Sequence, residues 1–211
     1  ALPIFSDSLK ILCNHDKIKE FSSITTITLT DQLDDLIARA EKLRRKYKGN
    51  HVSIHILTNA RSGNCSQDCA YCAQSCRSTA DIEKYKWVDD EKLYSDNAFV
   101  HDNHLSRHCI GLSGMKFTDE DIEELAEKIR VMKADGTHLC CSIGFLTEKQ
   151  ALILKEAGLD RINHNLNSSR SYYHNICTTH TYEQRVNKRC SHELLYVVWL
   201  KLLLEYRMNL Q

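Results

Sequence analysis

The central part of the sequence alternates between strand-like and helix-like segments, and this alternation restricts the fold more than any other feature. Short apolar or alternating segments predict four strands, at 51–57, 107–112, 139–143 and 161–166. Apolar residues at helical spacing predict helices at 119–132 and 147–157. Such a rhythm is typical of parallel strands joined by right-handed crossovers, in either a doubly wound sheet or a (β/α) barrel.

The length of the chain limits how much of a barrel it can form. A complete eight-stranded barrel takes about 250 residues, whereas this chain has 211. A further helix, expected at 30–49, precedes the first strand and leaves room for only four or five strand-helix units. The sequence therefore predicts a helical flank at 1–50 followed by a partial α/β barrel. Chemistry in such a barrel occurs at the C-terminal ends of the strands.

Charge and hydropathy exclude several classes of partner. The 28 Lys and Arg residues balance the 28 Asp and Glu residues, so we expect no basic surface for nucleic acid or for an anionic membrane. The most apolar stretch, 194–206, contains Lys201 and Glu205 and is shorter than the roughly 20 residues that span a bilayer. The first residues show no secretory leader, and we expect a cytoplasmic protein.

Ten cysteines in a reducing compartment indicate metal or redox chemistry rather than disulfides. Cys65, Cys69 and Cys72 follow the first predicted strand in one short segment. A structural zinc ion takes four ligands, and Cys76 could supply the fourth as part of a zinc knuckle. Three thiolates also suit a 4Fe-4S cluster that leaves one iron open. Spacing alone leaves both alternatives standing.

The sequence around these cysteines helps to decide between a zinc site and an iron-sulfur cluster. TNARSGNCSQDCAYCAQS, residues 58–75, resembles the cluster loop of biotin synthases, members of the radical S-adenosylmethionine (SAM) superfamily, in which an aromatic residue precedes the third cysteine. Tyr71 stands at that position and is expected near SAM. The resemblance runs from about 51 to 185, with a poor match at 82–104, and implies a partial TIM-type barrel of the radical SAM kind, truncated or diverged after about residue 185.

The resemblance also implies cofactors, a substrate and partners. Cys65, Cys69 and Cys72 would hold a 4Fe-4S cluster whose open iron binds the amino and carboxylate groups of SAM. One electron, from a donor such as flavodoxin, would cleave SAM to a 5′-deoxyadenosyl radical, and sulfur insertion into dethiobiotin would give biotin. A homodimer is one arrangement that the resemblance allows.

Further site residues follow from the blocks that match the family. Cys109 and Cys140 would be ligands of a second, 2Fe-2S cluster, although without the resemblance they fit buried packing positions better. Asn163 and Asn165 would bind the ureido ring of dethiobiotin. Asn167 replaces the aspartate expected at the SAM ribose. By themselves the asparagines equally fit turn and capping positions.

Arg185 matches a family arginine, whereas three neighbouring positions depart from the family or lack a functional role in it. Arg185 would pair with the SAM carboxylate, for which a planar guanidinium is suited. His164 is expected to be structural, and His180 replaces an arginine and has no assigned role. Cys177 has no family counterpart and is assigned to packing.

The tail after Arg185 no longer follows the family. The resemblance therefore implies a partial barrel at 51–185 and a diverged apolar tail at 186–211. Cys190 comes too early to match the third 2Fe-2S cysteine. Two accounts of the apolar run stay open: a helix over the open edge of the barrel, or a coding sequence that diverged or shifted frame. Two alternatives to a biotin synthase-like enzyme remain. One is a different radical SAM reaction, by a lyase or methylase, and the other is a truncated, non-catalytic iron-sulfur remnant.

Overall fold

The computed structural model describes residues 33–187 and 196–198. The chain divides into two compact units, Ala1–Val52 and Ser53–Gln211, and each is described by itself. No helix among the described residues is long and apolar enough to cross a membrane.

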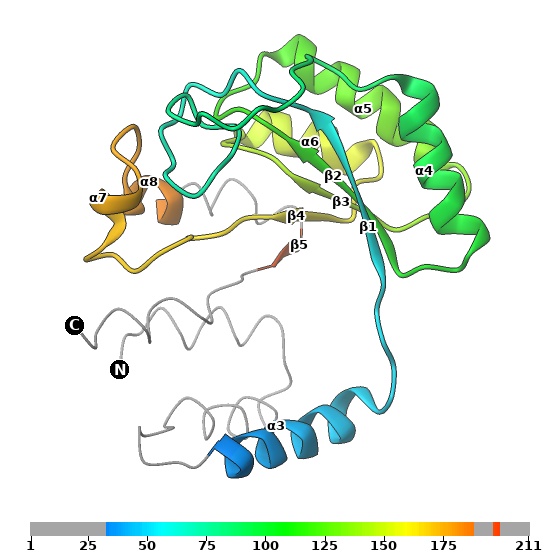
Figure 1. Cartoon of the computed structure of the whole chain (residues 1–211). Helices are drawn as coiled ribbons and strands as arrows, with labels where there is room; N and C mark the ends of the chain where they lie inside the picture. Colours follow the sequence, from blue (N-terminus) through cyan, green and yellow to red (C-terminus); the bar gives the residue numbers. More distant parts are fainter. Residues whose placement is uncertain (1–32, 188–195, 199–211) are drawn as a thin grey trace. The chain divides into compact units, whose positions relative to one another are not determined.

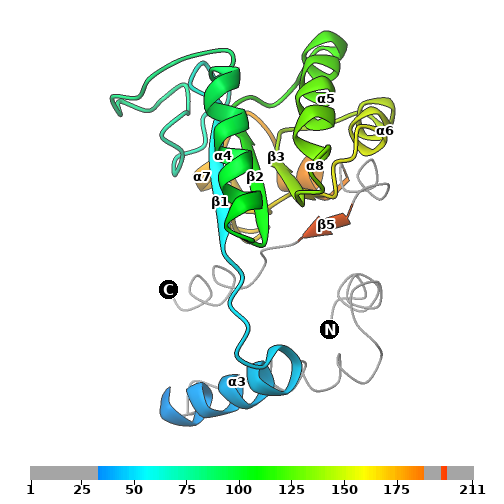
Figure 2. The ribbon, with the colours of Figure 1, turned by 90° about the vertical axis from the view of Figure 1, so that its right-hand side faces the viewer.

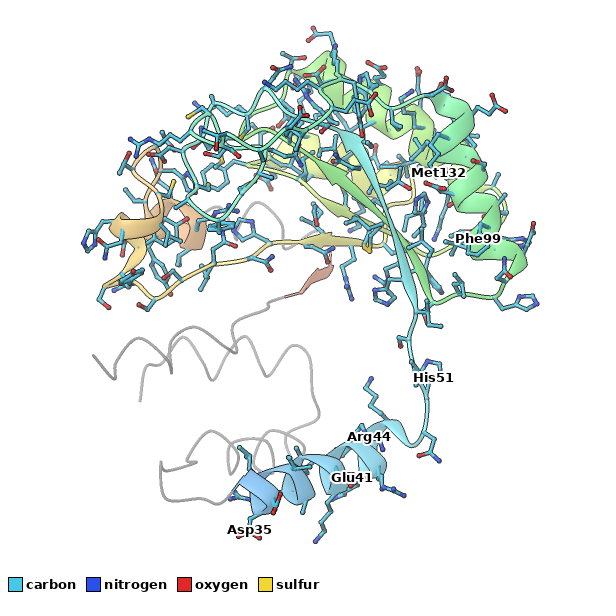
Figure 3. The ribbon with its side chains drawn as sticks, in the orientation of Figure 1. Asp35, Glu41, Arg44, His51, Phe99 and Met132 are labelled. Carbon is cyan, nitrogen blue, oxygen red and sulfur yellow. A yellow bond between two sulfur atoms is a disulfide. The ribbon has the colours of Figure 1, made fainter. Side chains whose placement is uncertain are left out.

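The described part of the first unit is one charged helix, α3 (Leu33–Lys48). Acidic residues occupy its first turn and basic residues its last turn, which complements the helix dipole. Glu41 forms an ion pair with Arg45, 2.8 Å apart and one turn further on, and Figure 3 shows Asp35, Glu41 and Arg44 along this helix. Gly49, with φ of 58°, follows the last turn. The helix predicted at 30–49 is confirmed over 33–48, and 30–32 lie outside the described residues.

The second unit contains a parallel five-stranded sheet. Its strands are β1 (His55–Arg61), β2 (Arg107–Leu112), β3 (Leu139–Ser142), β4 (Arg161–Asn163) and β5 (Tyr196–Val198), hydrogen-bonded in that order. The order never reverses, as it would at the switch point of a doubly wound sheet. Three helices connect the first strands and cover one face of the sheet: α4 (Asp90–Asp102), α5 (Asp119–Lys133) and α6 (Glu148–Glu156) (Figures 1 and 2). The fold is a partial α/β barrel of the TIM type, as predicted.

The helices begin where the sequence places a capping residue. The Thr118 hydroxyl accepts a hydrogen bond from the backbone N–H of Asp121 at the start of α5. Thr147 and Gln150 form a complete capping box at the start of α6. The predictions for β2, α5 and α6 are confirmed within one residue at each end. The two helices combine a clear apolar period with a cap.

Two predicted strands have different bounds in the structure. The strand expected at 51–57 is β1, which begins at His55, where pairing with Arg107 begins, and runs on to Arg61. Val52 and Ile54, two of the alternating apolar residues in the predicted segment, lie before β1 and are exposed. Polar Thr58 is buried in β1 instead, and its polarity hid the continuation of the strand. The strand expected at 161–166 ends at Asn163.

α4 was not predicted. It lies in the stretch that matches the family poorly, and its N-cap is Asp89. Its three buried residues are Leu93, Asn97 and Val100, so a polar residue interrupts the apolar stripe that periodicity would detect. The exposed side chain of Phe99 on α4 and the buried side chain of Met132 on α5 are labelled in Figure 3.

A helix in the apolar tail, one of the two accounts left open by the sequence, is wrong for the three residues of the tail that the structure describes. Tyr196–Val198 form β5, which pairs in parallel with β4. Pairing with an available strand edge suits two successive valines, which prefer strands to helices. The rest of that run, and Cys190, lie outside the described residues.

The core lies between the sheet and the three helices. Its fully buried side chains include Ile110 of β2, Leu125 of α5, Leu154 of α6 and Ile162 of β4. Buried His108 is satisfied by Thr58, at 2.8 Å, and by Asn97, at 3.1 Å. Because side chains alternate along a strand, the opposite face of the sheet carries a different set: Arg107, Cys109, Cys140, Ser142, Arg161 and Asn163.

Candidate metal centre

The cysteine loop begins with a tight turn directly after β1. Gly63 and Asn64 have φ of 69° and 51°, in the left-handed region that Gly and Asn adopt most readily. A side chain at position 63 would also meet Lys84 at 2.5 Å. The turn reverses the chain so that the following cysteines lie at the C-terminal ends of the strands.

Backbone hydrogen bonds shape the rest of the loop. The N–H of Cys72 donates to the carbonyl of Cys69 at 3.1 Å, and the N–H of Cys76 donates to the carbonyl of Gln67 at 2.9 Å. The N–H of Ala70 donates to the carbonyl of Ile176 at 2.9 Å, at the end of α7 (Tyr173–Ile176). Figure 1 accordingly shows α7 at the end of the sheet that carries the cysteine loop.

Asp68 fastens the cysteine loop to the segment after α7. Its carboxylate accepts hydrogen bonds from the backbone N–H groups of Thr178, at 2.9 Å, and Thr179, at 3.2 Å, and from both threonine hydroxyls. The Cys177 thiol donates to it at 3.2 Å. These hydrogen bonds, Thr178 foremost, hold the pKa of Asp68 well below its ordinary range.

One pocket of about 200 Å³ brings together every residue that the sequence assigned to the 4Fe-4S cluster, SAM or the substrate. Its lining includes Cys65, Cys69, Cys72, Tyr71, Asn163, Asn165, Asn167 and Arg185. They come from the loop after β1, from β4 with the segment after it, and from α8 (Tyr182–Asn187). Cys76 is exposed and is not among the lining residues. The roles of the eight residues stay predictions, whereas their meeting in one pocket is a property of the fold.

The three asparagines reach this pocket through a two-residue alternation that continues past the end of β4. Asn163, Asn165 and Asn167 line it, while the intervening His164 and Leu166 are buried. Asn167 has φ of 67°, a left-handed conformation that asparagine tolerates. Asn163 also donates to Ser142 at 3.4 Å and contacts the Cys140 sulfur at 3.5 Å.

Arg185 supplies the positive charge of the pocket. Its guanidinium lies over the Phe145 ring, 5.7 Å from the centroid, and its backbone carbonyl lies 3.0 Å from Nε2 of His164. Burial, and then the charge of Arg185, lower the pKa of His164 to about 4, so this histidine is neutral and structural. The Nε atom of Arg185 is buried without a hydrogen-bond partner among the described residues. Such an atom is available to an anionic ligand.

The predicted ligands of a second cluster lie beside each other on adjacent strands. Cys109 of β2 and Cys140 of β3 are register partners, and the structure joins them in a disulfide with a Cα–Cα distance of 4.7 Å. Register partners on adjacent strands lie within disulfide reach, and the role of both cysteines as cluster ligands stays a prediction. Neither sulfur can bind iron while the bond is present. Cys141, the next residue of β3, lies fully buried in the core.

A larger cavity of about 680 Å³ adjoins the pocket and was not predicted. The two share Gln67, Ser113, Gly114 and Met115. Its other lining residues are mostly polar and include Arg61, Lys116, Thr179, His180 and Gln184. Together the two spaces offer room for more than one small molecule.

Residues 59–188 match the Radical SAM superfamily. The chain belongs to this superfamily. Membership implies a 4Fe-4S cluster and SAM, and the residues present fit both. Three cysteines with no fourth in the same pocket suit a cluster with one open iron, and the buried, unpartnered Nε of Arg185 suits a carboxylate.

The resemblance of this radical SAM chain to biotin synthases is confirmed. A biotin synthase of Lysinibacillus sphaericus (strain C3-41) is 40% identical over 84% of this chain and 53% of its own length. One of Leptospira biflexa is 41% identical over 72% of this chain and 43% of its own length. The chain therefore spans about half the length of the curated relatives it matches.

Solved structures agree on the fold. The crystal structure of methylornithine synthase (PylB) superposes with a TM-score of 0.70 at 19% identity, over 84% of this chain and 53% of that one. The hydrogenase maturase HydG of Carboxydothermus hydrogenoformans gives 0.66 at 15% identity, over 83% and 41% of the two chains. At these identities the likeness concerns the fold alone.

Three residues of the centre were missed or given no role from the sequence. Asp68 lies inside the cysteine motif, and its contacts run to a segment more than 100 residues away, so its neighbours in sequence gave no signal. Cys177 and His180, assigned to packing and to no role, contact each other at 3.1 Å between the sulfur and Nδ1. The signal that could have found them is that both depart from the family pattern within four residues.

Proposed function

We propose that this chain is the cluster- and SAM-binding part of a biotin synthase-like enzyme, which cleaves SAM reductively and inserts sulfur into dethiobiotin. The observation that supports the proposal best is the common pocket, into which three cysteines, three asparagines and one arginine converge from distant parts of the sequence. The identity to curated biotin synthases supports this reaction over other radical SAM reactions.

In this proposal Cys65, Cys69 and Cys72 hold the 4Fe-4S cluster. When bound with SAM and supplied with one electron, this cluster provides a 5′-deoxyadenosyl radical that removes hydrogen from an unactivated carbon. Burial, foremost, raises the pKa of Cys69 to about 12 in the cluster-free protein, so this thiol must lose its proton as iron binds. The hydrogen bonds of Asp68 keep the loop in place meanwhile.

The other lining residues bind and orient the two small molecules. Arg185 pairs with the SAM carboxylate through its unpartnered Nε and its adjacent N–H groups. Asn167 accepts from the ribose, with neutral rather than charge-assisted hydrogen bonds. Asn163 and Asn165 present donors and acceptors to the ureido ring of dethiobiotin. An electron donor of the flavodoxin type would meet the cysteine loop, where Cys76 and Tyr71 are exposed.

Cys109 and Cys140 are the described residues that we assign to a 2Fe-2S cluster, the proposed sulfur source. They face the barrel interior beside Asn163, which contacts the Cys140 sulfur. Two thiolates are half of the usual four ligands. The disulfide must be reduced before either cysteine can bind iron.

The first experiment tests the cluster. The full chain is reconstituted anaerobically with iron and sulfide and analysed for metal content and by Mössbauer spectroscopy. Cys65→Ala, Cys69→Ala and Cys72→Ala should each lose the 4Fe-4S signal, whereas Cys76→Ala, outside the pocket, should keep it. A wild-type chain that still refuses iron after its zinc has been removed, and that rebinds zinc only while Cys76 is present, would support the zinc knuckle and refute the proposal.

The second experiment separates the proposed reaction from its alternatives. The reconstituted chain is incubated with SAM, a flavodoxin-type reductant and dethiobiotin, and 5′-deoxyadenosine and biotin are measured separately. Deoxyadenosine whose formation rises on addition of dethiobiotin supports the substrate assignment. Deoxyadenosine formed at the same rate with and without dethiobiotin indicates a different radical SAM reaction. No deoxyadenosine at all indicates a non-catalytic iron-sulfur protein.

A further inference from the structure

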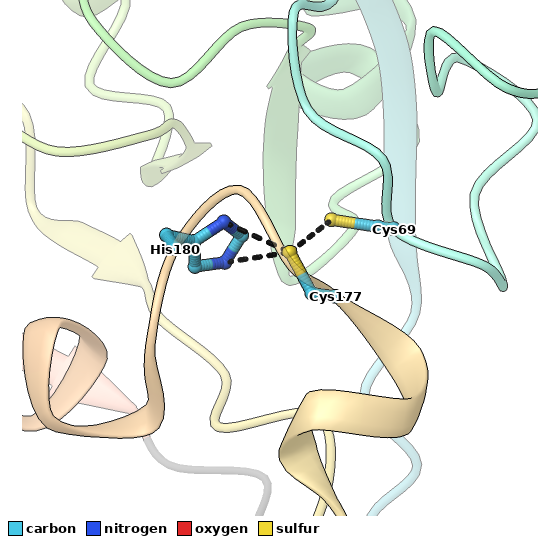
Figure 4. A group of neighbouring side chains, drawn as sticks. All are labelled: Cys69, Cys177 and His180. Atoms are coloured by element: carbon cyan, nitrogen blue, oxygen red, sulfur yellow. Dashed lines mark hydrogen bonds between the residues drawn. The ribbon is translucent and has the colours of Figure 1, made fainter.

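Three potential metal ligands lie together in the cysteine loop and the segment after α7, and only one of them belongs to the cluster motif. The sulfurs of Cys69 and Cys177 are 3.9 Å apart, and Nδ1 of His180 is 3.1 Å from the Cys177 sulfur (Figure 4). All three ligand atoms lie within 4.8 Å of one another, and all three residues are buried. Cys65 and Cys72 are not part of this group.

These separations are close to those of a tetrahedral metal site. With Zn–S bonds of about 2.3 Å, two thiolates on one tetrahedral ion stand roughly 3.8 Å apart. The sulfur-sulfur distance of 3.9 Å matches this value without rearrangement. Two thiolates and one imidazole are a donor set that suits Zn²⁺ and similar thiophilic ions. A water molecule can complete the tetrahedron from the 680 Å³ cavity, which His180 also lines.

The surroundings provide the second layer of contacts that metal-binding histidines and cysteines use. The Tyr173 hydroxyl lies 2.9 Å from Nε2 of His180 and can accept a hydrogen bond from it once Nδ1 binds a metal. Gln67, whose Oε1 is 2.8 Å from Nδ1, must release that nitrogen. The bonds of Asp68 to Thr178 and Thr179 fix the segment that carries the two new ligands.

We infer that Cys69, Cys177 and His180 form a site for one thiophilic divalent ion such as Zn²⁺, separate from the iron-sulfur motif and sharing only Cys69 with it. Zinc in this site and iron in the cluster motif exclude each other, because both need the thiolate of Cys69. This exclusion rests on the proposed function, whereas zinc binding itself does not. A zinc-loaded chain is then unable to assemble its cluster until zinc is removed.

Binding is tested with Co²⁺, whose absorption reports tetrahedral thiolate ligation, on the full chain prepared anaerobically without iron. We expect one Co²⁺ per chain with thiolate charge-transfer bands, displaced by Zn²⁺. Cys177→Ser and His180→Gln should abolish these bands, and Tyr173→Phe should lower the affinity about tenfold. Cys65→Ser, Cys72→Ser and Cys76→Ser should leave them intact. Bands that depend on Cys65, Cys72 or Cys76 and ignore Cys177 would overturn the inference.

A second measurement on the wild-type chain avoids any failure of a variant to fold. Alkylation followed by mass spectrometry, with and without Zn²⁺, identifies the protected cysteines. Zinc should slow modification of Cys69 and Cys177 and leave Cys65, Cys72 and Cys76 unchanged; the opposite pattern refutes the site. Iron-sulfur reconstitution of Cys177→Ser is a separate readout. If neither it nor the wild type takes up a cluster, the proposed function fails while the zinc result stands.

Discussion

The carboxylate of Asp68 accepts a hydrogen bond of 2.9 Å from the backbone N–H of Thr178, 110 residues further along the chain. The same carboxylate also accepts from Thr179, the Cys177 thiol and both threonine hydroxyls. One side chain thus ties the proposed cluster ligands to the segment that leads into α8 and Arg185. The geometry of the centre depends on a residue that binds neither metal nor substrate.

Replacing Asp68 with Asn should loosen this connection. The amide keeps one acceptor oxygen but turns an N–H₂ group toward donors, which leaves hydrogen bonds of the threonines unmade. We expect hydrogen exchange at the Thr178 and Thr179 amides to rise about tenfold, with a lower urea midpoint. Asp81→Asn, at an exposed position, is the matched control. Unchanged exchange at both amides would contradict the role given to Asp68.

The contribution of Asp68 should also depend on pH. Its folded pKa lies below the ordinary value of about 3.9 of an unfolded chain, so the carboxylate binds fewer protons in the folded state. Its stabilising effect is fully present above about pH 4 and is lost as the pH falls toward the folded pKa. Urea unfolding of wild type and Asp68→Asn should therefore give midpoints that converge below pH 4. A gap that widens on acidification would show the sign to be wrong.

Asn167→Asp should strengthen SAM binding to the reconstituted chain. Both residues tolerate the left-handed conformation at this position, where φ is 67°, so the exchange introduces no strain. A carboxylate forms stronger hydrogen bonds to ribose hydroxyls, and the gain should be about 1 kcal/mol or more. Isothermal titration calorimetry measures it, with Asn167→Ala as the variant that should weaken binding. Equal binding by Asn167→Asp would remove the ribose assignment.

Shortening a side chain of α5 should destabilise the second unit strongly only where that side chain faces the sheet. Leu125 is 1% exposed, whereas Val131 on the same helix is 56% exposed. Leu125→Ala should cost about 2–5 kcal/mol of unfolding free energy. Val131→Ala should change it by less than about 0.5 kcal/mol. Urea denaturation followed by circular dichroism compares them, and similar losses from both would place the core elsewhere.

The Cys109–Cys140 disulfide predicts a definite thiol count. Chain unfolded in an alkylating agent without reductant should leave these two cysteines unmodified, and each should gain one alkyl group after reduction. Peptide mass spectrometry gives the result. The Cys140→Ser variant should show a reactive Cys109 without reductant. Two reactive thiols in unreduced wild type would mean that the pair stands ready for iron.

The elements that could be predicted from the sequence are those whose local signals agree. β2, α5 and α6 each combine an apolar period with a cap or a sharp end, and they were predicted almost to the residue. α4 was missed because Asn97 is buried in its apolar stripe, where it bonds to the carbonyl of Met132 at 3.0 Å. β5 was not predicted, and a helix was considered in its place, because strand pairing depends on a partner elsewhere in the chain.

In the pocket, too, local sequence patterns identified some residues, whereas other contacts are visible only in the folded structure. Cysteine spacing and family blocks selected residues at 65–72, 163–167 and 185 that the fold brings together. Spacing could not reveal that Cys177 lies 3.9 Å from Cys69, since that distance arises from the return of the chain after β4. Nor could it show that Cys109 and Cys140 would bond, because their meeting depends on the register between β2 and β3.

The long separation in sequence between Asp68 and Thr178 means that the cysteine loop is synthesised well before the segment that fixes it. Cys65, Cys69 and Cys72 leave the ribosome more than 100 residues ahead of Thr178, the partner that fixes their loop. Translation at roughly 5–20 residues per second makes that interval about 5–20 s. During this interval the loop lacks its hydrogen bonds to Thr178, and its three thiols are accessible to iron, zinc or oxidants. The metal content of the finished protein is therefore decided partly by what the nascent chain meets first.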